Sequence, residues 1–190
     1  MKVNFLKAKA LLLLCTLSLG SMAIASGNLL ANPGFEDGNL TGWTLSRPSY
    51  LTTVTPNLTY VHSGSFGLES VEYGSEIYLS QSIPTVTGET YRVSLWLSTL
   101  ETDGFLNSIS VWFDGVQIGA ETEVSSSDWV QKSYYTKATS DTTEVKYGFR
   151  NDSGIFRADD FSVEAVPEPA TMFGLALGGL ALIRRRRQRA

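Results

Sequence analysis

The chain has 190 residues, of which 43% are hydrophobic and 18% are charged. This composition supports one domain with a hydrophobic core and excludes a disordered chain. The net charge of −4 conceals a segregation, because eight of the 15 basic residues lie in the first nine or the last seven positions. Residues 27–164 retain 7 basic and 18 acidic residues, a net charge of about −11 that repels a phosphate backbone. We therefore expect no nucleic-acid partner.

The first 25 residues have the three parts of a secretory signal peptide. A start with three lysines precedes an apolar run at 10–19, and Ala23-Ile24-Ala25 forms a small-x-small cleavage site. The apolar run is much shorter than the roughly 20 residues that a membrane-spanning helix needs. We therefore expect residues 1–25 to form a signal helix that is removed, which leaves a mature chain without cysteine.

The last 25 residues combine three features in a fixed order. Pro167, Glu168 and Pro169 form a stiff spacer, because each proline disfavours helix at the residue before it. The apolar segment 170–183 would be about 21 Å long as a helix, which is shorter than a hydrocarbon core of about 30 Å. Four consecutive basic residues follow it, and they are Arg184, Arg185, Arg186 and Arg187.

This order of motif, apolar segment and basic cluster resembles the PEP-CTERM sorting signal of Gram-negative bacteria, over residues 166–190. The resemblance implies that an exosortase, a transpeptidase-like membrane enzyme, recognises Pro-Glu-Pro and cleaves near it. It also implies export through the inner membrane, with transient insertion through 170–183 and the arginines in the cytoplasm. The processed protein would then reach the cell surface or an exopolysaccharide matrix.

Residues 27–164 contain short runs rich in Thr, Val, Tyr, Phe and Ile, which alternate with period two and are separated by Gly, Asn, Asp or Ser. Asp114-Gly115 predicts a hairpin between 107–113 and the residues that follow. With no helical period, these runs predict an all-β domain over residues 26–165, folded as a two-sheet jelly-roll sandwich. The expected strands are 50–55, 58–62, 66–71, 76–83, 90–99, 107–113, 129–137, 144–150 and 156–164.

The alternation also assigns the two faces of three strands. The inward positions are apolar, and they are Tyr91, Val93, Leu95, Leu97, Ile109, Val111, Phe113, Val145, Tyr147 and Phe149. The outward positions are mostly polar, yet they include Trp96 and Trp112. Two outward tryptophans among polar neighbours indicate either a binding surface or side chains that a loop covers.

Several short motifs follow one another along the body. They are Asn32-Pro33-Gly34-Phe35-Glu36-Asp37-Gly38, Trp43, His62-Ser63-Gly64-Ser65, Leu79-Ser80-Gln81, Gly88-Glu89-Thr90-Tyr91, Trp129 and Asp159-Asp160-Phe161-Ser162-Val163. This series resembles the galactose-binding-like jelly roll of many carbohydrate-binding modules, and it spans nearly the whole body.

The resemblance implies a structural calcium site where the opening and closing segments of the jelly roll lie side by side. Glu36 and Asp160 would supply carboxylates, and carbonyl groups around Gly64 and Ser65 would complete the shell of 6–8 oxygen atoms that Ca²⁺ prefers. In the alternative, both acids cap turns or accept hydrogen bonds from backbone amides.

A sugar site needs exposed aromatic planes for the C–H faces of the rings and polar neighbours for the hydroxyl groups. The best platform combines Trp96 and Trp112 with Arg92, Asp114 and Arg150. The secondary candidates in or near loops are Tyr50, Tyr60, Tyr73, Tyr78 and Phe156. Trp43 and Trp129 lie beside turns and match positions in the sandwich core.

The sequence contains no Gly-x-Ser-x-Gly elbow, zinc-binding His pattern or phosphate-binding Gly loop. The single histidine, His62, lies beside Ser63-Gly64 and is interpreted as a turn residue. Two carboxylates can hydrolyse a glycoside, but Asp159 and Asp160 are expected on opposite faces of one strand. We expect no enzyme activity, with glycoside hydrolysis left open.

The sequence thus predicts a secreted, exosortase-sorted protein whose jelly roll binds extracellular polysaccharide without catalysis. The alternative is a structural matrix or adhesion protein that binds other proteins and has no sugar site.

Overall fold

The computed structural model describes residues 27–100, 106–125 and 127–167. The expected signal helix 1–25, the apolar segment 170–183 and the cluster Arg184 to Arg187 lie outside these residues. In the part of the chain that is described, no helix has the length and apolar character to cross a membrane. The compact unit Ala23–Glu168 contains every residue of the hydrophobic core, so it carries the packing that a self-supporting domain needs.

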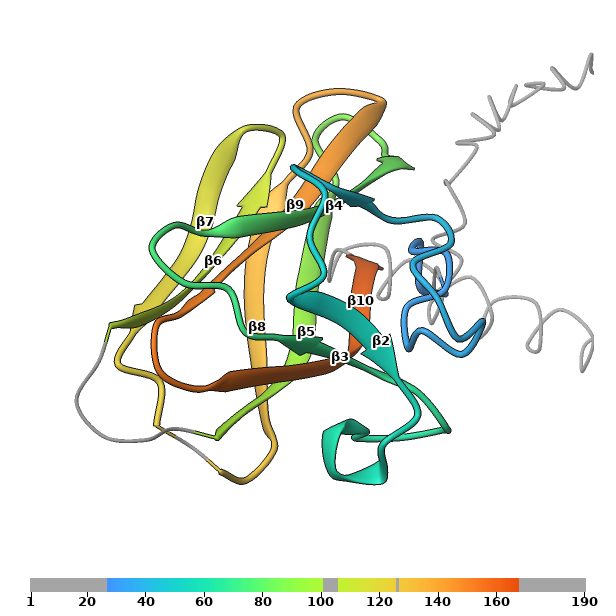
Figure 1. Ribbon diagram of the computed structural model, residues 1–190. Coiled ribbons are helices and arrows are strands. Elements are labelled where there is room, and N and C mark those ends of the chain that lie inside the picture. Colours follow the sequence, from blue (N-terminus) through green and yellow to red (C-terminus); the bar gives the residue numbers. More distant parts are fainter. Residues whose placement is uncertain (1–26, 101–105, 126, 168–190) are drawn as a thin grey trace, which may run out of the picture. The chain divides into compact units, whose positions relative to one another are not determined.

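The described residues form ten strands and one short 3₁₀ helix (Figure 1). The elements are β1 (Thr44–Leu45), β2 (Thr52–Thr55), η1 (Leu58–Tyr60), β3 (Gly67–Ser70), β4 (Ile77–Pro84), β5 (Thr90–Leu100), β6 (Asn107–Phe113), β7 (Val116–Thr122), β8 (Val130–Lys137), β9 (Thr142–Asn151) and β10 (Ile155–Val166). The prediction of an all-β domain is therefore confirmed.

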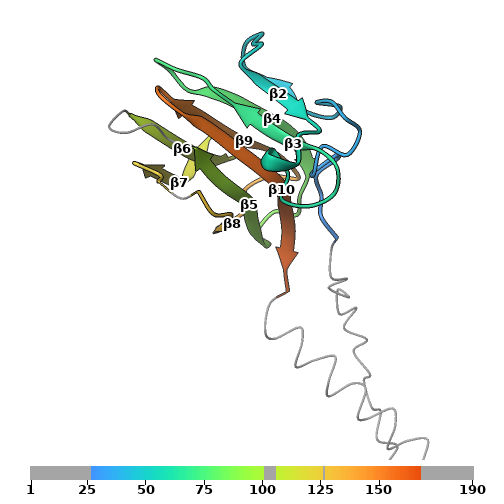
Figure 2. The same ribbon diagram turned by 60° about the horizontal axis from the view of Figure 1, so that its bottom comes forward.

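The strands pair in two antiparallel sheets of five strands each. Sheet I has the order β1-β4-β9-β6-β7, and sheet II has the order β2-β3-β10-β5-β8. Figure 2 shows β3, β10 and β5 side by side in one layer, as their pairing requires. The predicted two-sheet jelly-roll sandwich is therefore confirmed, and each sheet has one face toward the core and one outer face.

Eight of the nine expected strand ranges contain a strand. The range 58–62 was wrong, because η1 forms there when the Asn57 side chain accepts a hydrogen bond from the Thr59 amide and caps the turn. The hairpin between β6 and β7 is confirmed. Asp114 and Gly115 both have positive φ, at 52° and 76°, as a two-residue turn of this kind requires. The two-residue strand β1 was missed, since it is too short to show alternation.

The predicted inward rows of β5, β6 and β9 are confirmed, because every one of those side chains is buried. Trp43 also lies in the core, where its ring contacts Phe35, Phe161 and Tyr147 at centroid distances of 5.4–6.1 Å. The core position expected for Trp129 was wrong. Its half-exposed ring lies on the outer side of sheet II, 5.6 Å from the Arg157 guanidinium group.

The opening segment of the body lies along β10, as the resemblance implied. The Leu29 amide donates to the Val163 carbonyl at 2.9 Å, and the Phe161 amide donates to the Pro33 carbonyl at 3.0 Å. Opposite β5, strand β10 has a bulge between Asp159 and Ser162. Such a bulge re-aims the side chains that it contains, and this one brings the two neighbouring carboxylates described below toward the same loop.

Candidate functional site

The five residues predicted to form one sugar platform lie on two different faces. Arg92 and Trp96 belong to β5 in sheet II, whereas Trp112 and Arg150 belong to β6 and β9 in sheet I. Asp114 lies in the turn after β6. Because a sandwich buries the inner face of each sheet, its two outer faces point away from each other. The prediction of a single platform was therefore wrong, and each face must be considered separately.

On the outer face of sheet I, strand pairing sets the side chains in adjoining rows. Ser110 of β6 pairs with Gly148 of β9, which pairs with Tyr78 of β4. Two residues further along, Trp112 pairs with Lys146. Since side chains two positions apart in a strand point to the same side, both rows face outward.

Lys146 lies between the two aromatic rings of these rows. Its Nζ atom is 5.1 Å from the Tyr78 ring centroid and 5.2 Å from that of Trp112. The two rings are therefore at most about 10 Å apart, with a cation held between them. Within the described residues, Lys146 has no carboxylate in an ion pair with it, so its charge remains accessible to a ligand.

A carboxylate lies at the side of the aromatic pair. The oxygens of Glu76 accept hydrogen bonds from the hydroxyl groups of Ser108 at 3.0 Å and Ser110 at 2.8 Å. The Trp112 indole donates to the same Ser110 hydroxyl at 3.1 Å. Burial, together with the Glu76 carboxylate, raises the pKa of Tyr78, so its hydroxyl group stays neutral. These bonds fix the acceptors of Glu76 in place beside the rings.

Arg150 is held in one orientation at the end of this face. Its Nε and Nη2 atoms donate to the two oxygens of Asp152 at 2.8 and 2.6 Å, and the Gly74 amide donates to the same carboxylate. These donors lower the pKa of Asp152 to about 2, so the pair is charged at neutral pH. A guanidinium group has five N–H donors, and those that Asp152 does not use remain for a ligand.

Gly148 forms the floor between these groups. A Cβ atom at this position would lie 2.4 Å from Ser110 Oγ, 2.6 Å from Glu76 Oε2 and 2.8 Å from Tyr78 Cε1. The absence of a side chain therefore allows the acid and the ring to approach each other. We call this surface the sheet I face, and it comprises Glu76, Tyr78, Ser108, Ser110, Trp112, Lys146, Gly148, Arg150 and Asp152.

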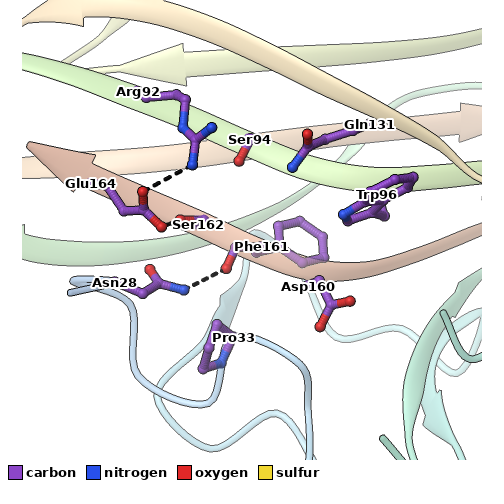
Figure 3. Close-up of a pocket in the computed structure, with 10 residues that line it drawn as sticks. All are labelled: Asn28, Pro33, Arg92, Ser94, Trp96, Gln131, Asp160, Phe161, Ser162 and Glu164. Carbon is purple, nitrogen blue, oxygen red and sulfur yellow. Dashed lines mark hydrogen bonds and ion pairs between the residues drawn. The ribbon is translucent and has the colours of Figure 1, made fainter. Parts of the chain in front are cut away.

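On the outer face of sheet II, one face of Trp96 is covered. The His62 ring stacks on it with a centroid distance of 4.0 Å and an angle of 15° between the planes. Arg92 forms an ion pair with Glu164 at 2.9 Å. Between them is an open pocket of about 300 Å³, shown in Figure 3. The pocket is lined by Asn28, Pro33, Arg92, Ser94, Trp96, Gln131, Asp160, Phe161, Ser162 and Glu164.

The two acids expected to bind calcium meet at the same loop. Both oxygens of Glu36 accept a hydrogen bond from the Ser65 amide at 3.0 Å. Asp160 bonds to the His62 ring at 2.6 Å and accepts from the Ser63 hydroxyl at 2.8 Å. The fold thus brings Glu36, Asp160 and the 63–66 loop together. Both carboxylates accept hydrogen bonds from donors of that loop, as the alternative to a calcium site expects.

This cluster could bind a hard cation only if backbone carbonyl oxygens join the carboxylates as ligands. Across the described residues, no three His, Cys, Asp or Glu side chains form a metal-binding group. A calcium shell would therefore need Glu36 and Asp160 together with carbonyl oxygens of the loop. Calcium stays a prediction, with the cluster as its location.

The position of Asp159 contradicts the expectation that its carboxylate and that of Asp160 lie on opposite faces of one strand. Its carboxylate accepts from the amides of His62 at 2.8 Å and Ser63 at 3.1 Å, so both acids reach the same loop rather than opposite faces. Burial raises the pKa of Asp159 to about 6, against the opposing effect of these amide donors.

The secondary aromatic candidates have different environments. Tyr50 and Tyr73 are exposed, and Tyr60 lies in η1. Phe156 was expected near a loop, but it is buried in the core on the inner side of β10. Tyr78 belongs to strand β4 and to the sheet I face. Glu76 and Lys146 were not predicted as site residues.

Residues 165–187 match the PEP-CTERM protein-sorting motif. The chain therefore carries this sorting signal, and the match begins in the last two residues of β10. No curated protein matches the chain.

Among solved structures, the body resembles carbohydrate-binding modules. TmCBM61, solved with β-1,4-galactotriose, has a TM-score of 0.58 and 21% identity, covering 74% of this chain and 100% of that one. The CBM22-1 xylan-binding domain of Paenibacillus barcinonensis Xyn10C has a TM-score of 0.57 and 18% identity, covering 77% and 99%. A CBM4 structure has a TM-score of 0.51 and 15% identity, covering 72% and 99%. At these identities the likeness shows the jelly-roll fold.

Proposed function

We propose that this protein is exported and sorted to the cell surface or the extracellular matrix, where its sandwich binds polysaccharide without catalysis. The sorting motif at 165–187 supports the export and processing by an exosortase. The likeness to modules solved with β-1,4-galactotriose or named for xylan binding supports a carbohydrate ligand. The sheet I face is the site that we propose for it.

The observation that carries this proposal is the pair of rings on the sheet I face. Tyr78 and Trp112 lie at most about 10 Å apart with Lys146 between them, which suits two sugar units of one chain. A sugar presents apolar C–H faces to such rings and hydroxyl groups to the polar side chains beside them. Glu76 would accept hydrogen bonds from hydroxyl groups, and Arg150 would donate to them.

The charges favour a neutral polysaccharide. Lys146 and Arg150 are balanced on the sheet I face by Glu76 and Asp152. The body as a whole carries a net charge of about −11, which opposes a polyanion at low salt. A neutral chain bound through hydroxyl groups avoids this repulsion.

The sorting motif would act through processing in the membrane. Transient insertion through 170–183 would hold the chain in the inner membrane of a Gram-negative bacterium until an exosortase cleaves near Pro167, Glu168 and Pro169. Strand β10 ends at Val166, so the mature protein would keep the complete sandwich. Mass spectrometry of the released protein tests this step, because a C-terminus that still contains Arg189 would reject it.

The binding test is titration calorimetry of the Ala23–Glu168 unit with xylan and β-1,4-galactan oligosaccharides. Trp112→Ala should weaken binding at the sheet I face at least about tenfold, since one aromatic anchor contributes most of the binding energy in sites of this kind. Tyr50→Ala removes an exposed tyrosine that is not among the residues of the sheet I face and should leave binding unchanged. If neither oligosaccharide binds, the alternative of a matrix or adhesion protein with protein partners takes its place.

We also propose that Glu36 and Asp160 hold a structural Ca²⁺ ion with carbonyl oxygens of the 63–66 loop. When bound, the ion would neutralise paired carboxylates and tie the opening segment to β10. This role replaces part of the stabilisation that disulfides supply in other secreted domains.

A further inference from the structure

The outer face of sheet II contains a second hollow that the sheet I site does not use. Strand pairing sets Tyr135 of β8, Arg92 of β5 and Glu164 of β10 in one row across the sheet. Four residues along β5, Gln131 pairs with Trp96. These two rows bound an elongated surface, with Tyr135 in one row and Trp96 in the other.

The surface between these rows is open. The pocket of about 300 Å³ beside Trp96 adjoins a second one of about 260 Å³, and the two share Arg92 and Glu164. Tyr135, 64% exposed, lines the second pocket, together with Val166, the last residue of β10, and Pro167, which follows it. We call the two pockets together the β5 trough. Four residues of strand span about 13 Å, which is the length of two or three sugar units.

The backbone is shaped to open this trough. At the bulge of β10, Asp160 has a φ of 47° and turns toward the pocket, while Phe161 turns into the core. Bulges and left-handed non-glycine residues gather at ligand sites, where the surrounding structure compensates for the strain. Figure 3 shows the opening segment, with Asn28 and Pro33, closing the side of the pocket opposite β5.

The lining of the trough suits a neutral sugar. The positive charge of Arg92 is met by Glu164, whose other oxygen accepts from the Ser162 hydroxyl at 2.9 Å. The exposed amide of Gln131 offers both a donor and an acceptor. An anionic sugar would meet the carboxylates of Asp160 and Glu164, so hydroxyl groups are the better partners.

We infer that the β5 trough is a second carbohydrate site, which takes a short neutral segment of polysaccharide along β5. The inference rests on the proposed function for its class of ligand. Since the two sites lie on opposite outer faces of the sandwich, one molecule holds two polysaccharide segments at once. The protein is then a cross-linker of the extracellular matrix in addition to being bound to it.

The test is the stoichiometry of oligosaccharide binding to the Ala23–Glu168 unit, measured by titration calorimetry with xylohexaose and β-1,4-galactotriose. The trough variant is Gln131→Ala with Tyr135→Ala, because both side chains are exposed and the fold does not depend on them. The variant of the first site is Trp112→Ala. The matched control is Tyr50→Ala, an exposed tyrosine before β2, which lies at the other edge of sheet II from β8.

Two sites are expected in the wild type and in the control, and one in each variant, with the affinity of the remaining site changed by less than about twofold. One site in the wild type, lost with Trp112→Ala and untouched by the trough variant, overturns this inference and leaves the proposed function standing. Absence of binding by either oligosaccharide overturns both.

A second measurement tests the cross-linking directly. A surface coated with β-1,4-galactan or xylan is loaded with the protein and then exposed to the same polysaccharide carrying a fluorescent label. The wild type and Tyr50→Ala should capture the label, whereas the trough variant and Trp112→Ala should bind to the coat and capture none. Equal capture by the trough variant and the wild type would contradict the inference.

Discussion

Replacing Tyr147 with phenylalanine should stabilise the fold. The ring is fully buried in β9 and makes edge contacts with Trp43 and Phe161. Among the described residues, its hydroxyl group has no hydrogen-bond partner, and burial raises its pKa well above the usual range. Phenylalanine keeps the ring contacts and removes the unpaired hydroxyl group.

The expected gain follows from the cost of burying that group. An unpaired buried hydroxyl group costs about 1–3 kcal/mol of stability. Its removal leaves a small gap, which offsets part of the gain. We expect the free energy of unfolding to rise by about 1 kcal/mol, which corresponds to about 3 °C in Tm for a domain of this size. Urea denaturation and differential scanning calorimetry of the Ala23–Glu168 unit measure both quantities.

Tyr91→Phe is the matched control with the opposite sign. Tyr91 is also buried, but its hydroxyl oxygen accepts a hydrogen bond from the Val86 amide at 2.8 Å. Its removal should lower stability by up to about 1 kcal/mol. A loss of stability in Tyr147→Phe, equal to that in Tyr91→Phe, would refute the reasoning.

Three further predictions concern the sites. Gly148→Ala should weaken oligosaccharide binding at the sheet I face at least about tenfold, because the new methyl group must displace the Ser110 hydroxyl, the Glu76 carboxylate and the Tyr78 ring; unchanged affinity of that site in calorimetry would contradict it. A calcium chelator should lower the Tm of the wild type but not of Glu36→Gln, and a wild type that does not respond rejects the calcium proposal. Because the pKa of Asp152 is about 2 rather than 3.8, its ion pair stabilises the fold above pH 4 and is lost as the pH falls toward 2. Asp152→Asn should remove this part of the acid-induced loss of stability in pH-dependent denaturation, and an unchanged profile would be evidence against it.

The sequence predicted the strands and their inner faces well, because alternation reports directly which side chains are apolar. It could not predict that the candidate sugar-binding residues divide between the two sheets. Alternation places Trp96 and Trp112 outward from their own strands, but it does not tell which sheet each strand joins. Strands β5 and β6 follow each other in the chain and yet belong to different sheets. The two tryptophans therefore belong to separate faces.

The remaining differences depend on local geometry that leaves no periodic signal. The bulge in β10 reverses the expectation for Asp159 and Asp160, since a strict alternation of period two cannot represent an extra residue. The packing of His62 on Trp96 joins residues far apart in sequence. By contrast, the meeting of Glu36 with the 63–66 loop was implied by the resemblance, because the same motifs occur there in the same order.

The most direct test of the central claim is the indole N–H signal of Trp112 in NMR spectra of the ¹⁵N-labelled Ala23–Glu168 unit. The Trp112 indole lies on the sheet I face and donates to Ser110, whereas the Trp43 indole donates to the Asn32 carbonyl beside the core. On titration with a xylan or β-1,4-galactan oligosaccharide, the account predicts that the Trp112 signal shifts and the Trp43 signal stays. Binding seen in calorimetry with the Trp112 signal unmoved would contradict it.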